Sequence, residues 1–202
     1  MDLLNLTDLE IWSSFKKGDE KALSFIYASN AEKLYRYGLK FTSESSLVED
    51  SIQDLFLELI RNRKNLGETD NILYYLLKSF RRKLLRKLRM TTQFEHNKCI
   101  EVNNFDIVWS VEHDIIKGED LKHKRRMLLK ALNDLTPRQR EAIYLRFSRE
   151  LNYITIAGIM EISVEACRNI ISKAIKSLKR SISGNGHNSL VLFQLIENIS
   201  WG

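Results

Sequence analysis

Hydrophobic residues recur at helical spacing along most of the chain, and the clearest case is residues 43–64. Their apolar positions are separated by three, four, seven and eight residues, which places them on one side of a helix. They are Leu47, Val48, Ile52, Leu55, Phe56, Leu59 and Ile60. Four acids, Glu49, Asp50, Asp54 and Glu58, lie toward the other side. The pattern predicts a helix that is apolar on one side and acidic on the other.

The N-terminal part predicts three shorter helices before this one. A first helix is expected to begin at Thr7 or Asp8, each a good capping residue, and to end at a turn formed by Gly18 and Asp19. A second helix should follow this turn, and a further separate helix is expected over residues 31–41. The first part of the chain is therefore predicted to be a helical domain.

A strongly basic helix is predicted over residues 72–90. It contains seven cations and no acid: Lys78, Arg81, Arg82, Lys83, Arg86, Lys87 and Arg89. Like charges on one helix repel each other unless an anion lies nearby, and a phosphate backbone would be such an anion. The aromatic residues Tyr74, Tyr75 and Phe80 also suit unstacked bases. A solvated basic face over a core that contains these rings is the alternative.

Periodicity weakens after residue 91, where Asn and acidic residues become frequent. We therefore expect two small helical domains, 1–91 and 123–182, joined by an acidic linker over 92–122. The second domain has a well-marked helix start, with Thr136 as N-cap, Pro137 in the first position and Gln139 in the third. A short apolar tail over 183–202 follows it and is expected to pack on this domain as extra core. A latch that covers the DNA- or polymerase-binding surface is the alternative.

Residues 153–180 are rich in isoleucine but predict two helices. Asn152 and Ser163 can cap them, and apolar residues after Ser163 recur at offsets that only a helix brings to one side. A short helix, a tight turn and a longer basic helix form a helix-turn-helix, whose second helix can enter the major groove of DNA. Its solvent side presents Glu165, Arg168, Asn169, Ser172, Lys173 and Lys176. A helical hairpin that only stabilises the fold is the alternative.

Composition supports an all-α fold, since the 202 residues include only 8 Gly and 1 Pro. A net charge of +6 is compatible with a polyanionic partner. The acidic N-terminus and the lack of a long apolar run argue for a cytoplasmic protein without membrane insertion. Cys99 and Cys167 lack the spacing of a metal site or a disulfide framework. No cofactor, small-molecule substrate or enzymatic activity is expected, because phosphate-loop and nucleophile patterns are missing.

Four segments, in sequence order, resemble those of the extracytoplasmic-function sigma factors of the sigma-70 family: residues 34–60, 74–89, 132–147 and 153–180. The first is similar to the segment that binds RNA polymerase, with Gln53, Asp54 and Phe56 at the positions of the family's Q-[DE]-x-F core. The second is similar to the helix that meets the minus-ten promoter element. The last two resemble the domain that reads the minus-thirty-five element.

This resemblance implies a non-enzymatic factor that binds core RNA polymerase and promoter DNA and helps to melt the promoter. Implied polymerase-binding residues are Glu49, Asp50, Gln53, Asp54 and Glu58, although plain solvation would also explain the acids. Implied minus-ten residues are Asn62, Arg63, Lys64, Asn65, Tyr75, Lys78, Arg81 and Arg82. The helix-turn-helix residues would read the minus-thirty-five element. An anti-sigma factor is a further partner that the resemblance implies.

The chain departs from the family pattern at three positions. Arg82, Thr155 and Glu161 stand where the family often has Asn, Glu and Gly. A non-glycine residue in a left-handed turn costs about 1 kcal/mol, so we expect the turn at Glu161 to take another shape. The competing hypothesis is a stand-alone helix-turn-helix regulator that binds duplex DNA as a dimer without polymerase.

Overall fold

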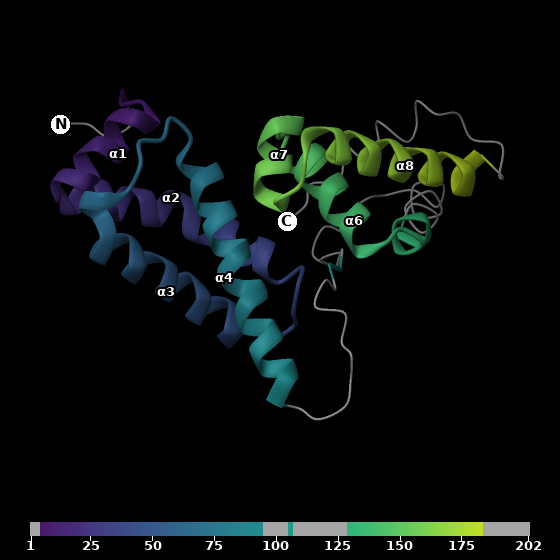
Figure 1. The fold of residues 1–202 in the computed structure, drawn as a ribbon, viewed down its shortest axis with the longest axis horizontal. Helices are drawn as coiled ribbons and strands as arrows, with labels where there is room; N and C mark the ends of the chain where they lie inside the picture. Colours follow the sequence, from purple (N-terminus) through teal and green to yellow (C-terminus); the bar gives the residue numbers. More distant parts are fainter. Residues whose placement is uncertain (1–4, 95–104, 107–128, 184–202) are drawn as a thin grey trace, which may run out of the picture. The chain divides into compact units, whose positions relative to one another are not determined.

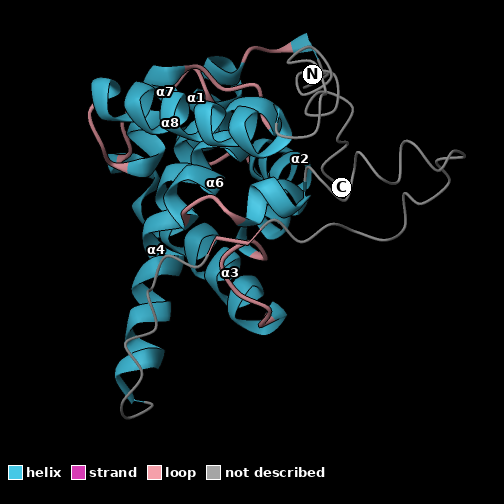
Figure 2. Cartoon of the chain, turned by 90° about the vertical axis from the view of Figure 1, so that its right-hand side faces the viewer, coloured by secondary structure: helices cyan, strands magenta, loops and turns pink. Residues whose placement is uncertain are grey.

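The computed structural model describes residues 5–94, 105–106 and 129–183, and the regular structure in these ranges is entirely helical (Figures 1 and 2). This confirms the predicted all-α fold. The chain divides into two compact units, Met1–Val102 and Asn103–Gly202. The linker and tail limits stay predictions, because most of residues 92–128 and the tail from 184 lie outside the described ranges. Among the described helices, none is both long and apolar enough to cross a membrane.

The first unit is built from helices that pack side by side (Figure 1). They are α1 (Asp8–Lys17), α2 (Glu20–Gly38), α3 (Ser45–Asn62), the 3₁₀ turn η2 (Arg63–Asn65) and α4 (Ile72–Phe94). Thr7 caps α1 with a capping box, Gly18 ends it in a left-handed conformation, and Asp19 caps α2. The predicted start of α1 and the turn after it are therefore confirmed.

Residues 20–38 form one helix, so the prediction of a separate helix over 31–41 was wrong. The break was expected near Asn30, a residue that often ends helices. In the structure Asn30 is buried, and its side-chain amide donates a 2.8 Å hydrogen bond to the carbonyl oxygen of Ile26. The polar side chain is thus satisfied inside the helix, and the backbone continues.

The core of the first unit forms where α2, α3 and α4 approach each other at Gly38. A Cβ atom at this position would lie 2.6 Å from a Val48 methyl carbon and 2.9 Å from the Phe80 ring. Phe80 is fully buried, so its ring is part of the core and is not available to stack on a base. The apolar stripe of α3 is buried as predicted at most positions, but Ile60 is 38% exposed near the end of the helix.

The second unit is also helical. Residues 129–133 form a helical segment, and α6 (Pro137–Ile143), the π-helical turn η4 (Tyr144–Ser148), α7 (Tyr153–Met160) and α8 (Val164–Ser183) follow. Thr136 and Gln139 form the predicted capping box, with Pro137 in the first turn. The helical register of α6 therefore follows from local sequence signals.

One described part of the predicted linker is packed into this unit. Phe105 is 1% exposed, and its ring centroid lies 5.5 Å from that of Tyr144. Hydrophobic periodicity could not predict this contact, because it requires several apolar residues at regular spacing and Phe105 is a single buried residue. The second unit thus includes at least one residue from the segment predicted to be a linker.

Candidate nucleic-acid interface

Helices α7 and α8 form the predicted helix-turn-helix. The Asn152 side chain accepts a 2.9 Å hydrogen bond from the backbone amide of Thr155, and the Ser163 hydroxyl accepts one of 3.1 Å from Ala166. Both predicted N-caps are therefore confirmed. The two helices meet through buried side chains: Ile156, Ala157, Ile159 and Met160 on α7, and Cys167, Ile171, Ala174 and Leu178 on α8.

The turn between them is left-handed at Glu161, with φ 55° and ψ 48°. The expectation that this turn would take another shape was therefore wrong. The Glu161 amide bonds back to the carbonyl oxygen of Ala157, and so does the amide of Ile162, at 3.0 Å. These bonds satisfy the end of α7 and oppose the steric cost of a non-glycine residue.

All the predicted DNA-facing residues of α8 are exposed: Glu165, Arg168, Asn169, Ser172, Lys173 and Lys176. Arg168 also lies over the Tyr153 ring, with its guanidinium carbon 5.9 Å from the ring centroid. Arg146 lies 5.1 Å from the same centroid. No sequence pattern predicts this cluster, because Arg146 comes from the π-helical turn outside the helix-turn-helix. Two guanidinium groups thus share one aromatic ring at the start of α7.

The first unit contains an open pocket of about 270 Å³ between α3 and α4. It is lined by Leu55, Glu58, Leu59, Asn62, Leu66, Tyr75, Ser79, Arg82, Lys83 and Arg86. Three predicted minus-ten residues, Asn62, Tyr75 and Arg82, therefore meet here. Cavities of roughly 150 Å³ hold benzene, so this pocket is large enough for a nucleobase. Ser79 was missed, since a lone serine in a basic helix carries no signal.

Tyr75 is the aromatic wall of this pocket. Burial raises the pKa of its phenol, and a side-chain hydrogen bond with Ser79 opposes this effect. The phenol therefore stays neutral around pH 7, and the half-buried ring offers both a stacking surface and a polar end. These are the properties that a pocket for an unstacked base requires.

The remaining predicted minus-ten residues are dispersed. Lys64 and Asn65 are exposed in η2, and Lys78 is half-buried on α4. Arg63 is half-buried beside α1. Arg81 is only 8% exposed, so its side chain is not presented on the surface. The spacing of the cations along α4 did not predict that Arg81 is buried, because α4 packs against α1, α2 and α3.

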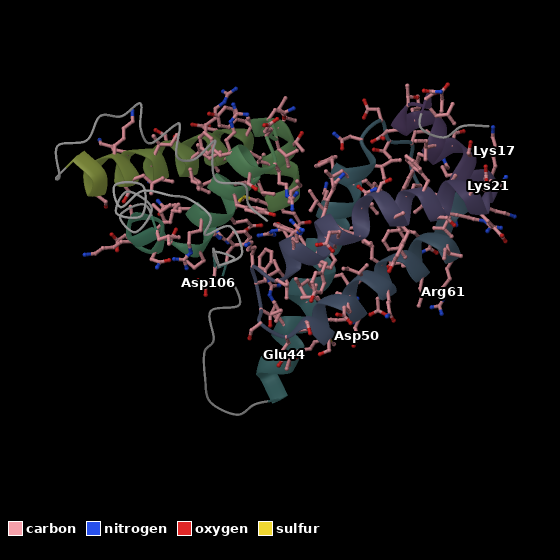
Figure 3. The ribbon with its side chains drawn as sticks, turned by 180° about the vertical axis from the view of Figure 1, so that it is seen from behind. Lys17, Lys21, Glu44, Asp50, Arg61 and Asp106 are labelled. Carbon is pink, nitrogen blue, oxygen red and sulfur yellow. The ribbon has the colours of Figure 1, made fainter. Side chains whose placement is uncertain are left out.

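The residues predicted to bind polymerase fall into two groups. Glu49, Asp50 and Gln53 are exposed along α3, and Figure 3 shows Asp50 on the outer side of this helix. Glu49 and Gln53 line a second open pocket of about 290 Å³ together with residues of α2. This pocket also contains Tyr27, Ala31, Glu32, Tyr35 and Ile52. The exposed part of α3 is therefore continuous with an aromatic part of α2.

Asp54 and Glu58 instead bind cations of α4. Lys87 Nζ lies 2.7 Å from the Asp54 carboxylate, and Lys83 Nζ lies 2.7 Å from that of Glu58. These hydrogen bonds lower the pKa of both carboxyl groups. The cations of α4, which looked unopposed in sequence, thus receive part of their counter-charge from α3.

Comparison with known proteins gives a family for both units. The family model described as Sigma-70 region 2 matches residues 26–93, and the one described as Sigma-70, region 4 matches residues 131–180. The first match covers α3 and α4, and the second covers α6 to α8. No curated protein sequence matches the chain.

Two solved structures are similar to the chain in fold. One is CnrH in complex with the cytosolic domain of CnrY, with a TM-score of 0.57, 16% identity, and coverage of 89% of this chain and 99% of that one. The other is the sigma factor RpoE in complex with the anti-sigma factor NepR from Bartonella quintana, with a TM-score of 0.55, 17% identity, and coverage of 82% and 97%. Regions 2 and 4 are matched in family order and together span more than half of the 202 residues, so the chain belongs to the sigma-70 family of sigma factors.

Proposed function

We propose that this sigma factor is of the extracytoplasmic-function type, binds core RNA polymerase and directs initiation at promoters with minus-thirty-five and minus-ten elements. The observation that carries the proposal is that each family region presents a surface suited to one promoter element. The second unit, which the region 4 model matches and which is called the region 4 unit below, exposes the predicted DNA-facing residues of α8. The first unit, which the region 2 model matches and which is called the region 2 unit below, contains the open pocket lined by aromatic and cationic side chains.

In the region 4 unit, α8 would enter the major groove at the minus-thirty-five element. Arg168 and Asn169 lie in the N-terminal half of the helix, which is the part that reaches base edges in this motif. Arginine can bind guanine and asparagine can bind adenine through paired hydrogen bonds. Lys176 and Lys179 lie further along the exposed side, where contacts to phosphates would fix the position of the helix.

In the region 2 unit, the pocket between α3 and α4 would hold a base flipped out of the minus-ten element. Unstacking a base costs a few kcal/mol, which stacking and phosphate contacts must offset. Tyr75 supplies a ring for stacking, and Asn62 supplies polar atoms for the base edge. Lys78, Arg82 and Arg86 supply positive charge for the backbone of the open strand. Arg81 is left out of this set because it is buried.

The outer side of α3 would bind the polymerase. Glu49, Asp50 and Gln53 are exposed there, and Leu57 and Ile60 continue the same side as exposed apolar residues. A protein surface that combines apolar contacts with surrounding charge is typical of a binding site for another protein. Asp54 and Glu58 would contribute less, because their charges are already paired with lysines of α4.

An anti-sigma factor is the second protein partner that we propose. Both similar structures are complexes, and one of them contains a sigma factor with its anti-sigma factor. The open pocket between α2 and α3 is a candidate contact for such a partner, since Tyr27 and Tyr35 line it. Tyrosine is enriched at protein interfaces.

Run-off transcription with purified core polymerase and a promoter library tests the proposed function. The full chain should initiate selectively, and an Arg168→Ala, Asn169→Ala variant should change its preference within the minus-thirty-five element. Lys179→Ala is the matched control on the same helix. Loss of a phosphate contact should weaken all templates alike and reduce the salt dependence of binding.

The competing function makes the opposite prediction. A stand-alone regulator would bind duplex DNA tightly without polymerase and would not support initiation. If the full chain neither binds core polymerase nor initiates, the proposed role of the outer side of α3 is wrong as well.

A further inference from the structure

Helix α1 lies outside the matched family region, which begins at residue 26, yet it contacts the segment between α3 and α4 at several points. Trp12 is at the centre of these contacts. Its side chain is fully buried, and its indole nitrogen donates a 2.8 Å hydrogen bond to the backbone carbonyl oxygen of Gly67. Its ring centroid also lies 4.9 Å from that of Tyr75. One side chain of α1 thus touches both the loop after α3 and a wall of the pocket.

Both ends of α1 hold the same segment. Near its start, the Asp8 carboxylate accepts a 2.8 Å hydrogen bond from the backbone amide of Ile72, the first residue of α4. Near its end, Lys16 forms an ion pair with Glu68. The segment is therefore tied to α1 at Gly67, Glu68 and Ile72, three positions within six residues.

Arg63 adds a contact at the C-terminal end of α1. A Cβ atom on Gly18 would lie 3.4 Å from a terminal nitrogen of the Arg63 guanidinium. The C-terminal end of a helix carries partial negative charge, which favours a cation there. Arg63 was predicted to contact DNA, but in the structure its side chain lies beside α1, at the start of the loop.

These contacts differ from ordinary core packing. A buried tryptophan needs a hydrogen-bond acceptor for its indole N–H. If α1 only filled the core, any nearby carbonyl oxygen could be that acceptor. Here the acceptor is a loop carbonyl, and Asp8 and Lys16 also bind groups at or just after that loop. Leu66, next to Gly67, and Tyr75, next to the Trp12 ring, both line the pocket.

We propose that α1 is a positioning element for the minus-ten pocket, with Trp12 holding the loop 63–71 and Tyr75 in the shape that selects the flipped base. This inference rests on the proposed function, because it assigns α1 to the same pocket. It adds that base selection at the minus-ten element depends on a helix that does not line the pocket.

The test is Trp12→Phe in the full chain. Phenylalanine keeps an aromatic ring against Tyr75 and Phe15 but cannot donate to Gly67. Run-off transcription is measured with core polymerase on templates that carry each base at each minus-ten position. We expect the preference for the best base to fall by about fivefold, the factor that corresponds to one neutral hydrogen bond. The base preference at the minus-thirty-five element should stay unchanged, and so should the ability of the variant to compete with the parent chain for core polymerase.

Lys16 and Lys17 provide matched variants on the same helix. Lys16 pairs with Glu68, whereas Lys17 is exposed at the outer end of α1 (Figure 3). Lys16→Ala and Lys17→Ala each remove one positive charge, so their general effect on DNA attraction is the same. Lys16→Ala should lower minus-ten discrimination by a smaller factor than Trp12→Phe, and Lys17→Ala should leave it unchanged. This pair keeps the test decisive if Trp12→Phe folds poorly.

Hydrogen exchange provides a second measurement that does not need transcription. The amides of residues 66–71 should exchange faster in Trp12→Phe than in the parent chain, and those of α8 should not change. If the parent chain fails to initiate, the proposed function is wrong, and the exchange data alone decide whether α1 holds the loop. If the parent chain discriminates bases and Trp12→Phe lowers initiation equally on all templates, α1 only stabilises the fold and the inference is overturned.

Discussion

Arg140 joins α6 to Phe105, a residue 35 positions earlier, by a 2.6 Å hydrogen bond from its Nε to the Phe105 carbonyl oxygen. Its Nη1 also donates to the carbonyl oxygens of Asn133 and Leu135, at 3.1 and 3.0 Å. A further nitrogen lies 3.3 Å from the Asp106 carboxylate. The Arg140 guanidinium therefore holds the segment that carries Phe105 against the start of α6.

Arg140→Lys should destabilise the region 4 unit. Lysine keeps the charge, but its single ammonium group cannot reach three carbonyl oxygens in the fork geometry of arginine. Partly buried acceptors would lose their partners, which we expect to lower the free energy of unfolding by about 2 kcal/mol. Hydrogen exchange of α6 and α8 amides in the full chain measures this. Arg138→Lys, at an exposed position of α6, is the control and should change little.

Gly38→Ala should destabilise the region 2 unit. The added methyl group would overlap Val48 and Phe80, both packed in the core, and overpacking of this kind costs about 1–3 kcal/mol. Urea unfolding of the full chain provides the measurement. Gly67→Ala is the control, since no atom lies within 4 Å of the added Cβ. Equal stability of the two variants would contradict the close approach of α2, α3 and α4.

Glu161→Gly should stabilise the helix-turn-helix. Glycine adopts the observed left-handed conformation without the steric cost of about 1–2 kcal/mol, which exceeds its own entropic cost of about 0.5–1 kcal/mol, so we expect a net gain of about 0.5 kcal/mol in the free energy of unfolding. Glu165→Gly makes the same chemical change in the first turn of α8 and should have the opposite sign, by about 0.5–1 kcal/mol. Chemical denaturation of both variants checks the prediction, and a loss of stability in Glu161→Gly would contradict it.

The ion pairs of Asp54 and Glu58 should make stability depend on pH. Hydrogen bonds from Lys87 and Lys83 lower the pKa of these carboxyl groups in the folded state. The unfolded chain then binds protons more readily, so the stabilisation is present above the ordinary carboxyl range and is lost as pH falls through the lower folded pKa. The Asp54 and Glu58 side chains are 47% and 60% exposed, and this contact with solvent limits each pair to about 0.5 kcal/mol.

An Asp54→Asn, Glu58→Gln variant measures this effect by urea unfolding. It should be less stable than the parent chain at pH 7, and the two should become equally stable once the pH falls below the lowered folded pKa of both carboxyl groups, where both are protonated. High salt at pH 7 should also remove most of the difference, because exposed charges are screened. A difference that persists at acidic pH would mean that these side chains stabilise the fold by packing rather than by charge.

The sequence by itself determined the features that depend on neighbouring residues. Helical period identified α3, α4 and α8, and capping residues such as Thr136 and Ser163 marked where helices begin. The exposed face of α8 was also predictable, since its apolar side follows directly from spacing along one helix. The order of family-like segments was sufficient to predict a sigma factor, as the family matches confirm.

Only the tertiary structure decided which charged and aromatic groups meet across elements. Arg81 and Arg82 are adjacent in sequence, yet one is buried and the other exposed, because neighbouring helices cover one side of α4. Contacts such as Trp12 with Gly67 join residues 55 positions apart. Local sequence patterns carry no information about such pairs, since these depend on how separate helices pack and not on the period of any one helix.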